Sequence, residues 1–436
     1  MNIRQCIMVA GLVGSARPAT SQEPATWASP IEGDSSLRVL VAEALERNPR
    51  MAQRHAAIRA ATLRIRPAGT LPDPMLSAGV MNLPLPKFAL RESDFTEVDV
   101  ELTQEIPWPG TLGARSAVAR AVARGADAQL GNARREIAVS TATAYYRLRY
   151  AAAALQALER QALLLEAAVQ LSTTRYATGA APQIDPLQAR LARDRLGAEE
   201  AALRGEYVVA QAAVNALRDR PSATAVAAAP FDAGELRAVL APLPPPDSLA
   251  TWALAVNPRV AAERAALEQA TRTIDVERLA SRPDFTFTTR YGHRPQLRFG
   301  FDPPDFFSAF VGLRLPVWAG RKQNRLADAA RADSAAAVAA LRETELALER
   351  EAVEIAARAD AARRRLKLLV DGVVPAARAT VESAVRSYQV GRVEFLTLVF
   401  VEDALFRAEV EAAAVAAELH THLVMLRQLT AGESQP

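Results

Sequence analysis

The hydrophobic period of the chain changes within one short stretch, Val98-Asp99-Val100-Glu101-Leu102-Thr103-Gln104-Glu105-Ile106-Pro107-Trp108-Pro109-Gly110. Apolar and polar residues alternate as far as Ile106, which predicts a strand with one apolar face. From about Thr111 the apolar residues instead follow the period of a helix. Pro107 and Pro109 each remove a backbone donor, so neither a sheet nor a helix continues smoothly through them. The stretch therefore predicts a strand that leads directly into a long helix.

A second copy of this arrangement follows later in the chain, at Val311-Gly312-Leu313-Arg314-Leu315-Pro316-Val317-Trp318-Ala319-Gly320. It too contains an alternating segment, a proline, a tryptophan and a glycine, and a helical pattern follows it. We interpret both copies as junctions, in which prolines end the strand and glycines allow a tight turn. The predicted junction residues are Pro107, Trp108, Pro109, Gly110, Pro316, Trp318 and Gly320.

The duplication extends to the segments before the strands. Ala44-Leu45-Glu46-Arg47-Asn48-Pro49-Arg50 and Ala253-Leu254-Ala255-Val256-Asn257-Pro258-Arg259 are identical at five of seven positions. In each segment we expect the asparagine to cap a helix that begins at the following proline. The order predicted for each copy is helix, two strands, long helix, turn and returning helix.

Each copy offers two extended segments, within about 72–106 and 283–317, separated by a proline-rich loop. Four strands cannot close a membrane barrel alone, because the smallest such barrels have about 8 strands. The strands therefore form either a soluble sheet or one part of a barrel to which several chains contribute. After the first residues, no uninterrupted apolar run approaches the roughly 18 residues of a membrane helix, so a membrane-spanning role would fall to the strands.

The helices after the two junctions carry a repeat of about 3.5 residues, which is typical of left-handed coiled coils. A helix from about 111 to 174 would be roughly 95 Å long, which exceeds any ordinary globular domain. Small seam residues let neighbouring helices approach closely. The seam positions include Ile137, Thr141, Ala144, Leu148 and Ala151 in the first copy and Leu348, Ala352, Ile355, Ala359 and Ala362 in the second.

These patterns predict the organisation of the whole chain. Residues 1–21 are expected to be a signal peptide and 22–36 a linker. Repeat 1 spans 37–218, with strands at about 72–106 and long helices at about 111–218. An irregular crossover at 219–246 leads to repeat 2 at 247–431, with strands at about 283–317 and helices at about 320–429. A tail follows at 432–436.

The first residues resemble a secretory signal. Arg4 precedes a short apolar stretch, Cys6–Val13, and the small residues Gly14-Ser15-Ala16 follow it. The alternative is a disordered start. Cys6 is the only cysteine, so no disulfide forms within the chain.

Composition and motifs argue against nucleic-acid binding, enzyme activity and metal binding. The net charge of +3 is small for 436 residues and gives no support to nucleic-acid binding. The sequence has no glycine-rich phosphate loop and no Gly-x-Ser-x-Gly motif. His420 and His422 lie two apart on a predicted helix, so they face opposite sides and cannot share a metal ion. We therefore expect no enzyme activity, no cofactor and no metal site.

Each long helix ends in a turn with the pattern Tyr-x-x-Gly. The first turn begins at Tyr176 and contains Gly179, and the second begins at Tyr388 and contains Gly391. Glycine is the usual residue at the end of a helix. Both long helices are therefore expected to fold back as hairpins.

With these features the chain resembles the TolC-like outer-membrane factor family, the exit ducts of tripartite efflux systems and of type I secretion. The resemblance rests on the duplication, the Asn-Pro helix starts, the Pro-Trp-Pro-Gly junction and the Tyr-x-x-Gly turns. It implies a mainly α fold with a membrane β-barrel, in which a homotrimer contributes four strands per chain to one shared 12-stranded barrel. Trp108 and Trp318 would then lie either at the membrane–water boundary or packed at the seam between strands and helices.

The resemblance also implies where the protein lies and what it contacts. The barrel would sit in the lipid of a Gram-negative outer membrane, and the helical hairpins would form an α-barrel tunnel through the periplasm. The partners implied are a periplasmic adaptor (membrane fusion) protein and an inner-membrane pump of the resistance-nodulation-division type.

Within the family, several segments are most similar to the heavy-metal (cobalt–zinc–cadmium or copper) branch. They are Leu71-Pro72-Asp73-Pro74-Met75-Leu76, Asn82-Leu83-Pro84 and Pro107-Trp108-Pro109-Gly110. None of them is a metal-binding motif, but they suggest passive export of heavy-metal cations. The alternatives are a drug efflux or type I secretion duct within the family and, from another class, a soluble periplasmic coiled-coil adaptor or scaffold without a pore.

The resemblance places the tunnel entrance at the two turns. Its best-known members carry acidic residues six and nine positions after the second glycine, where this chain has Thr397 and Phe400, whereas Asp185 keeps the first spacing after the first glycine. A frequent arginine is replaced by Val393, with Arg392 beside it. The candidate gate residues are Tyr176, Gly179, Asp185, Tyr388, Gly391, Arg392, Glu394, Thr397 and Phe400, with Glu402 and Asp403 as further acidic candidates.

Overall fold

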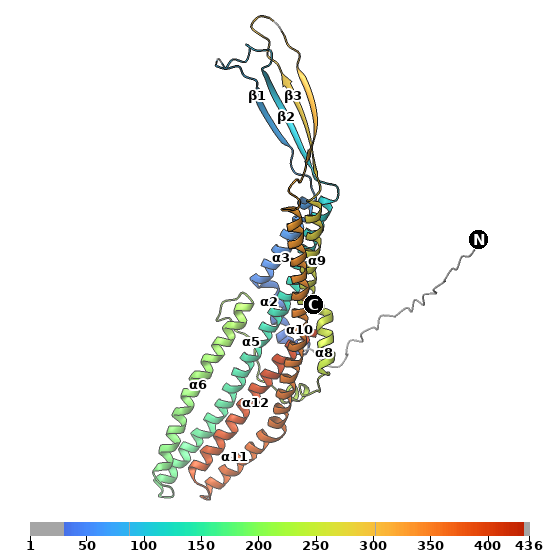
Figure 1. Cartoon of the computed structure of the whole chain (residues 1–436). Helices are drawn as coiled ribbons and strands as arrows, with labels where there is room; N and C mark the ends of the chain where they lie inside the picture. Colours follow the sequence, from blue (N-terminus) through green and yellow to red (C-terminus); the bar gives the residue numbers. More distant parts are fainter. Residues whose placement is uncertain (1–29, 87, 301, 431–436) are drawn as a thin grey trace, which may run out of the picture.

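The computed structural model describes residues 30–86, 88–300 and 302–430. The chain is elongated, with a small sheet at one end and a long helical bundle that reaches to two hairpin tips at the other (Figure 1). The expected signal peptide at 1–21, with Cys6, and the tail at 432–436 lie outside the described residues. The end of the expected linker is helical, because α1 (Pro30–Gly33) and the start of α2 (Ser35–Arg47) fall within it.

The sheet has four antiparallel strands in the order β1-β2-β3-β4. Their bounds are β1 Met75–Met81, β2 Glu97–Ile106, β3 Asp284–His293 and β4 Phe306–Arg314. The two strands of each repeat therefore form a hairpin, and the hairpins join where Val100 of β2 lies opposite Tyr291 of β3. The predicted mainly helical fold with four strands is confirmed.

The register gives the sheet one apolar and one polar face. Leu76, Val100 and Val311 belong to the apolar face and are 70%, 44% and 75% exposed. The polar face carries five carboxylates and two guanidinium groups, from Glu97, Asp99, Glu101, Glu105, Asp284, Arg290 and Arg314. Alternation along β2 therefore separates the two kinds of side chain, apart from Gln104, which lies on the apolar face.

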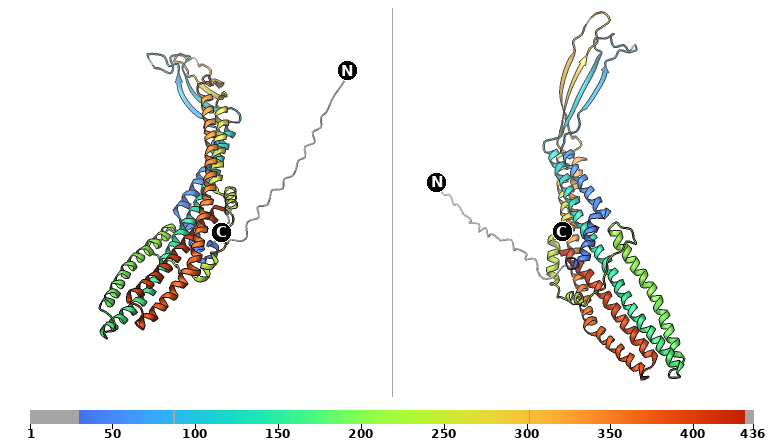
Figure 2. Two further views of the ribbon diagram at one scale, coloured as in Figure 1. Left: turned by 60° about the horizontal axis from the view of Figure 1, so that its bottom comes forward. Right: turned by 180° about the vertical axis from the view of Figure 1, so that it is seen from behind.

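One helix of 67 residues, α5 (Thr111–Ala177), runs from the sheet to the first tip. Along its sheet-proximal part it packs against α3 (Pro49–Leu63) and α9 (Pro258–Leu279), and along its distal part against α6 (Ile184–Leu217) and α12 (Phe395–Thr430) (Figures 1 and 2). A short helix, α4 (Ile65–Ala68), follows α3. Within the residues that the structure describes, no helix combines the length and apolar composition needed to cross a lipid bilayer.

The second long helix differs from the sequence expectation because it is interrupted. It consists of α10 (Gln323–Leu368), one wider π-helical turn (Leu369–Val373) and α11 (Val374–Gln389). Pro375 lies in the first turn of α11, where it lacks an N–H and its ring crowds the carbonyl four residues earlier. The wider turn accommodates that proline.

The segment between the repeats is also more regular than expected. The crossover at 219–246 contains a short helix, α7 (Ala233–Ala238), and α8 (Pro246–Val256) follows it directly. Asp232 starts α7, because its side chain accepts a hydrogen bond from the backbone N of Glu235 at 2.8 Å.

The Asn-Pro segments start helices as the sequence predicts. The side chain of Asn48 accepts a hydrogen bond from the backbone N of Arg50, and that of Asn257 from the backbone N of Arg259, each at 3.0 Å. Each asparagine thereby satisfies one of the donors that a helix leaves free at its first turn.

Alanine dominates the buried seams of the bundle. Buried positions such as Ala142 of α5 and Ala416 of α12 are fully shielded from solvent, and leucines such as Leu148 lie between them. Small side chains let the helix axes approach closely, so the bundle is thin and long (Figure 2).

Candidate functional site

The first strand–helix junction is fixed by contacts across the sheet. The backbone N of Trp108 donates to Oδ1 of Asp284 at 3.0 Å, and its ring stacks on Phe285 with centroids 5.9 Å apart. Gly110 has φ of +94° and precedes the first residue of α5. A side chain at that φ would be strained, so glycine permits the turn here. Pro107 is buried at the end of β2, whereas Pro109 is exposed.

The second junction does not repeat this geometry. Gly320 has no positive φ, Trp318 is 68% exposed, and α10 begins only at Gln323. Successive backbone hydrogen bonds fill the interval, including Ala319 N to Pro316 O at 2.9 Å. The expectation that both glycines allow a tight turn into the helix is correct for the first copy and wrong for the second, because the second turn uses more residues.

Both hairpin tips turn at their glycines. Gly179 has φ of +73° and Gly391 has φ of +74°, and the backbone N of each donates to the carbonyl of the tyrosine three residues earlier, at 3.0 Å. The two tips lie close together at the end of the bundle (Figures 1 and 2). The pattern Tyr-x-x-Gly therefore describes the same local turn twice.

Arg175, the last basic residue of α5, joins the two tips. Its Nη1 donates to the backbone O of Tyr388 at 2.5 Å, its Nη2 donates to the backbone O of Ala180 at 3.2 Å, and its guanidinium lies 4.9 Å from the centre of the Tyr388 ring. The Tyr388 hydroxyl donates to Oδ2 of Asp185 at 3.4 Å. We call Arg175, Asp185 and Tyr388 the tip bridge, since it connects α5, α6 and α11.

The tip bridge is backed by aromatic packing. Tyr388 is 1% exposed, and its ring meets Phe395 of α12 edge-on at 5.6 Å. Burial raises the pKa of Tyr388, and the neighbouring Asp185 carboxylate adds to that rise, so the hydroxyl stays protonated as a donor. Arg175 was not among the residues expected from the sequence, because only the folded hairpins bring it to the second tip.

The other expected tip residues lie at the surface. Tyr176 is 45% exposed and Phe400 is 72% exposed. The side chains of Arg392, Glu394 and Thr397 are exposed as well. The structure therefore brings two of the nine expected tip residues, Tyr388 and Asp185, into one side-chain contact.

The further acidic candidates differ from each other. Asp403 is partly exposed and pairs with Arg407 one turn along α12, at 2.8 Å. Glu402 is only 4% exposed and faces the bundle interior, so it does not stand at the tip surface.

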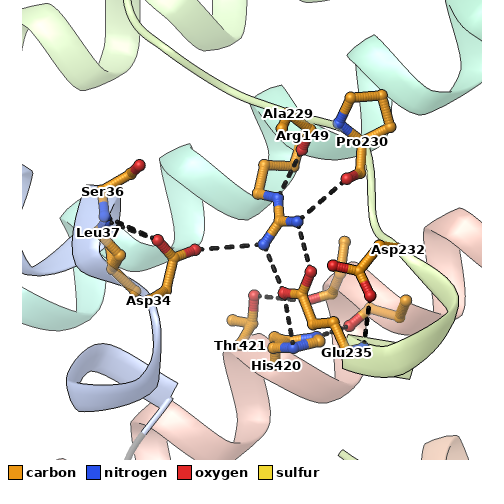
Figure 3. A network of polar contacts seen from close by, with 12 residues as sticks. Asp34, Ser36, Leu37, Arg149, Ala229, Pro230, Asp232, Glu235, His420 and Thr421 are labelled. Atoms are coloured by element: carbon orange, nitrogen blue, oxygen red, sulfur yellow. Dashed lines mark hydrogen bonds and ion pairs between the residues drawn. The ribbon is translucent and has the colours of Figure 1, made fainter. Parts of the chain in front are cut away.

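A second polar cluster lies near the middle of the chain and was not expected from the sequence (Figure 3). Arg149 of α5 donates to both oxygens of Glu235, at 2.5 and 2.6 Å, and to Oδ2 of Asp34 at 3.2 Å. It also donates to the backbone O of Ala229 at 2.8 Å, and its guanidinium lies 4.3 Å from the centre of the Phe231 ring. The Arg149 side chain is 6% exposed.

His420 of α12 completes this cluster. Its Nε2 lies 3.5 Å from Oε1 of Glu235, and its Nδ1 is 2.8 Å from the backbone O of Ala416. The imidazole ring also packs against Tyr146, with centroids 4.7 Å apart. Burial lowers the pKa of His420, and Arg149 lowers it further, so the ring is neutral near pH 7. We call Asp34, Arg149, Glu235 and His420 the Arg149 cluster.

The Arg149 cluster ties four parts of the chain together. Asp34 caps α2, Glu235 lies on α7 of the crossover, and the other two residues lie on α5 and α12. A cavity of about 710 Å³ adjoins it, lined partly by Tyr145. Sequence reasoning considered His420 only as a metal ligand and left the arginine out, because nothing local distinguishes Arg149 from the many other arginines.

The two histidines of α12 have separate partners. His422 lies 3.5 Å from Glu418 on its own helix, whereas His420 faces the crossover. In the part of the chain that the structure describes, no three His, Cys, Asp or Glu side chains are placed to hold a metal ion.

One protein-family model matches most of the chain. The model of the family described as outer membrane efflux protein matches residues 40–218 and 249–432, which correspond to the two sequence repeats. No curated protein sequence matches the chain.

Solved structures with the same fold include the outer-membrane channel OprN, CusC and the outer membrane protein VceC. The channel OprN is 19% identical with a TM-score of 0.77, over 95% of this chain and 94% of that one. CusC is 17% identical with a TM-score of 0.78, over 92% of each chain. VceC from Vibrio cholerae is 19% identical with a TM-score of 0.75, over 93% of this chain and 100% of that one. At these identities the likeness concerns the fold.

Proposed function

The chain belongs to the outer membrane efflux protein family, and from this premise we propose that it exports heavy-metal cations. Members of the family are passive, trimeric channels of the Gram-negative outer membrane that extend into the periplasm and work with periplasmic adaptors and inner-membrane pumps. This protein is accordingly the exit duct of a tripartite efflux system and not an enzyme. Family membership also decides against a soluble adaptor or scaffold.

The observation that carries the proposed cargo is the charge on the polar face of the sheet. Five carboxylates and two guanidinium groups share that face. Both arginines are already paired with carboxylates: Arg290 with Glu97 at 3.5 Å, and Arg314 with Glu105 at 2.5 Å. Asp99 is 8% exposed, and its Oδ1 accepts no hydrogen bond from the described residues. After these pairs are counted, the electrostatic potential of the polar face is negative, which favours cations over anions.

In a trimer this face would line the exit of the duct. A ring of carboxylates raises the local concentration of cations and repels anions, without binding any one ion tightly. Loose attraction suits a duct, because tightly held ions would not leave. The resemblance of the segments around Pro72, Leu83 and Pro107 to the heavy-metal branch supports the same cargo.

We further propose that the tips form the gate and the contact surface for the adaptor. The tip bridge holds the end of α5 to the end of α11, so opening the entrance requires these contacts to separate. Glycine permits the positive φ that both turns require. The pump upstream would be of the resistance-nodulation-division type, which supplies energy that the duct itself does not.

The test of the cargo combines tolerance and ion selectivity. A strain without this gene should become sensitive to heavy-metal salts and regain tolerance when the gene is restored. In planar bilayers, the purified trimer should prefer cations in a salt gradient, and Asp99→Asn with Glu101→Gln should reduce that preference. Thr289→Ser, on the opposite face of the same sheet, is the matched control. Unchanged metal tolerance together with lost drug or dye tolerance would assign the duct to another cargo.

A further inference from the structure

A groove in the helical wall lies a few turns from the tips. It is enclosed by α5, α11 and α12 and has a volume of about 550 Å³. Its walls are mainly apolar, with Val381 from α11 and Leu405 and Phe406 from α12. A cavity of this size and character is typical of sites for drug-sized molecules.

Glu402 lies in this groove at a position of α12 where an apolar residue would be expected. Leu398 and Phe406, one turn to either side, are both buried parts of the helical seam. Glu402 itself is 4% exposed, lines the groove, and has no hydrogen-bond or ion-pair partner among the described residues. A carboxyl group that is removed from water normally has a partner, because its desolvation otherwise opposes folding. Glu402 therefore lacks the hydrogen-bond or ion-pair partner that a buried carboxyl group normally has.

A second oxygen in the same groove is also unsatisfied. Oε1 of Gln161, on α5, is buried and accepts no hydrogen bond from the described residues. Gln161 and Glu402 come from different helices and different repeats, and both line the same groove. Both offer acceptor oxygens, so a group that pairs with both must be a donor.

The arginines of the groove do not supply that donor. Arg160 and Arg378 both pair with Glu409, at 2.7 and 2.8 Å, two turns along α12 from Glu402. Arg386 at the rim lies 4.0 Å from Glu382 on its own helix, and both side chains are mostly exposed. The positive charges that border the groove are thus directed toward other carboxylates.

We propose that this groove binds amphiphilic organic cations, with a primary ammonium at Glu402 and Gln161 and an apolar body along Val381, Leu405 and Phe406. An ammonium group has three donors and no acceptor, which matches the two unsatisfied oxygens. The enclosed volume suits a small molecule. This site lies in the wall between the two hairpins and is independent of which cargo passes through the duct.

The charge state of Glu402 gives the site a pH dependence. Burial raises the pKa of Glu402 to about 7. The ammonium binds the carboxylate better than the neutral acid, so affinity should increase as the pH rises from 6 to 8. The other charged groups that border the groove are Arg160, Arg378, Glu382, Arg386 and Glu409. Burial opposes ionisation of Glu409, but hydrogen bonds from Arg160 and Arg378 outweigh it and lower the pKa of that carboxyl.

The experiment uses the full-length trimer in lipid nanodiscs and a fluorescent primary amine, dansylcadaverine, with empty nanodiscs as the blank. Fluorescence anisotropy should show saturable binding of the amine at pH 8 and no saturable binding of its N-acetylated form. Glu402→Gln keeps the shape but removes the charge, and it should weaken binding about tenfold or more. Its affinity should also become independent of pH.

Two further variants and a control complete the test. Gln161→Leu should weaken binding about threefold, because a neutral hydrogen bond is lost. Leu405→Trp should fill the groove and abolish binding while leaving both polar groups in place. Glu411→Gln, on the same helix but outside the groove, should bind like the wild type. Equal binding of the acetylated probe, or unchanged affinity of Glu402→Gln, would overturn the proposal.

Discussion

Replacing Arg149 with methionine is expected to lower the free energy of unfolding by about 3–5 kcal/mol, the usual effect of breaking a buried ion pair from one side. The guanidinium is 6% exposed and bonds both carboxylates of its cluster. Methionine keeps much of the length of the side chain and none of its donors. Asp34 would retain its hydrogen bonds from the backbone N of Ser36 and Leu37, at 2.9 and 3.0 Å. Glu235 would then face only the uncharged ring of His420, whose Nε2 lies 3.5 Å from Oε1 of Glu235, so most of the loss should fall on Glu235.

A double-mutant cycle measures how much of that loss belongs to the pair. Glu235→Gln removes the charge that Arg149→Met leaves unpaired, so the double variant should recover about 2 kcal/mol relative to the sum of the single effects. Denaturant unfolding of the trimer, followed by far-ultraviolet circular dichroism, gives the four free energies. Strictly additive losses, or a loss below about 1 kcal/mol for Arg149→Met, would refute the claim that this pair fastens the crossover.

The pH dependence provides a second check on the same variant. The folded protein lowers the pKa of His420 below its ordinary value of 6.5, so the unfolded chain binds more protons and stability falls as the pH drops below that value. In Arg149→Met the repelling guanidinium is gone and Glu235 is free to accept from the imidazolium. The loss of stability on acidification should therefore be smaller than in the wild type. His420→Gln should remove this part of the pH dependence in both backgrounds.

Further predictions concern the tips, the wall and the helix starts. Glu402→Gln should have the same free energy of unfolding as the wild type near pH 4 and exceed it by up to about 3 kcal/mol at pH 8. The reason is that ionising the buried carboxyl opposes folding as the pH rises from 4.5 through about 7. Equal free energies of unfolding at pH 8 would contradict the burial of Glu402 without a partner. Arg175→Met should raise the single-channel conductance by weakening the tip bridge, and an unchanged conductance would remove it from the gate. In Gly391→Pro the proline cannot adopt the φ of +74° found at this turn, so efflux should fall although trimers still form. Normal efflux in this variant would exclude this turn as the gate. Asn257→Ala should lower the free energy of unfolding by about 1 kcal/mol, with no effect expected if water replaces the cap.

Local sequence patterns were sufficient for the elements and for their order. Alternation from Val98 to Ile106 gave β2 and its apolar face, because a strand places successive side chains on opposite faces whatever its neighbours are. The 3.5-residue repeat gave the long helices, and Asn48 and Asn257 gave two helix starts, because a cap acts within three residues.

Contacts between distant residues could not be predicted in this way. Arg149 and Glu235 are separated by 86 positions, and no periodic pattern relates them. Arg175 reaches Tyr388 across 213 positions, although Arg175 directly precedes one recognisable turn and Tyr388 begins the other. The break in the second long helix did leave a local signal, since Pro375 interrupts its pattern. The coiled-coil repeat concealed it, because the seam continues at the same spacing on both sides of the wider turn.

The positions of the arginines suggest how an alanine-rich bundle selects one register. Alanine seams distinguish registers weakly, because sliding a helix by one heptad again places small residues against small residues. Arg149, Arg160 and Arg175 lie on α5 at intervals of about 16 and 22 Å, and each contacts a different partner outside repeat 1: the crossover, Glu409 and the backbone of Tyr388. Only one register satisfies all three contacts. The planar guanidinium group of arginine directs its donors in a fixed geometry, whereas the ammonium group of lysine does not. This difference explains why these positions carry arginine, although lysine would supply the same charge.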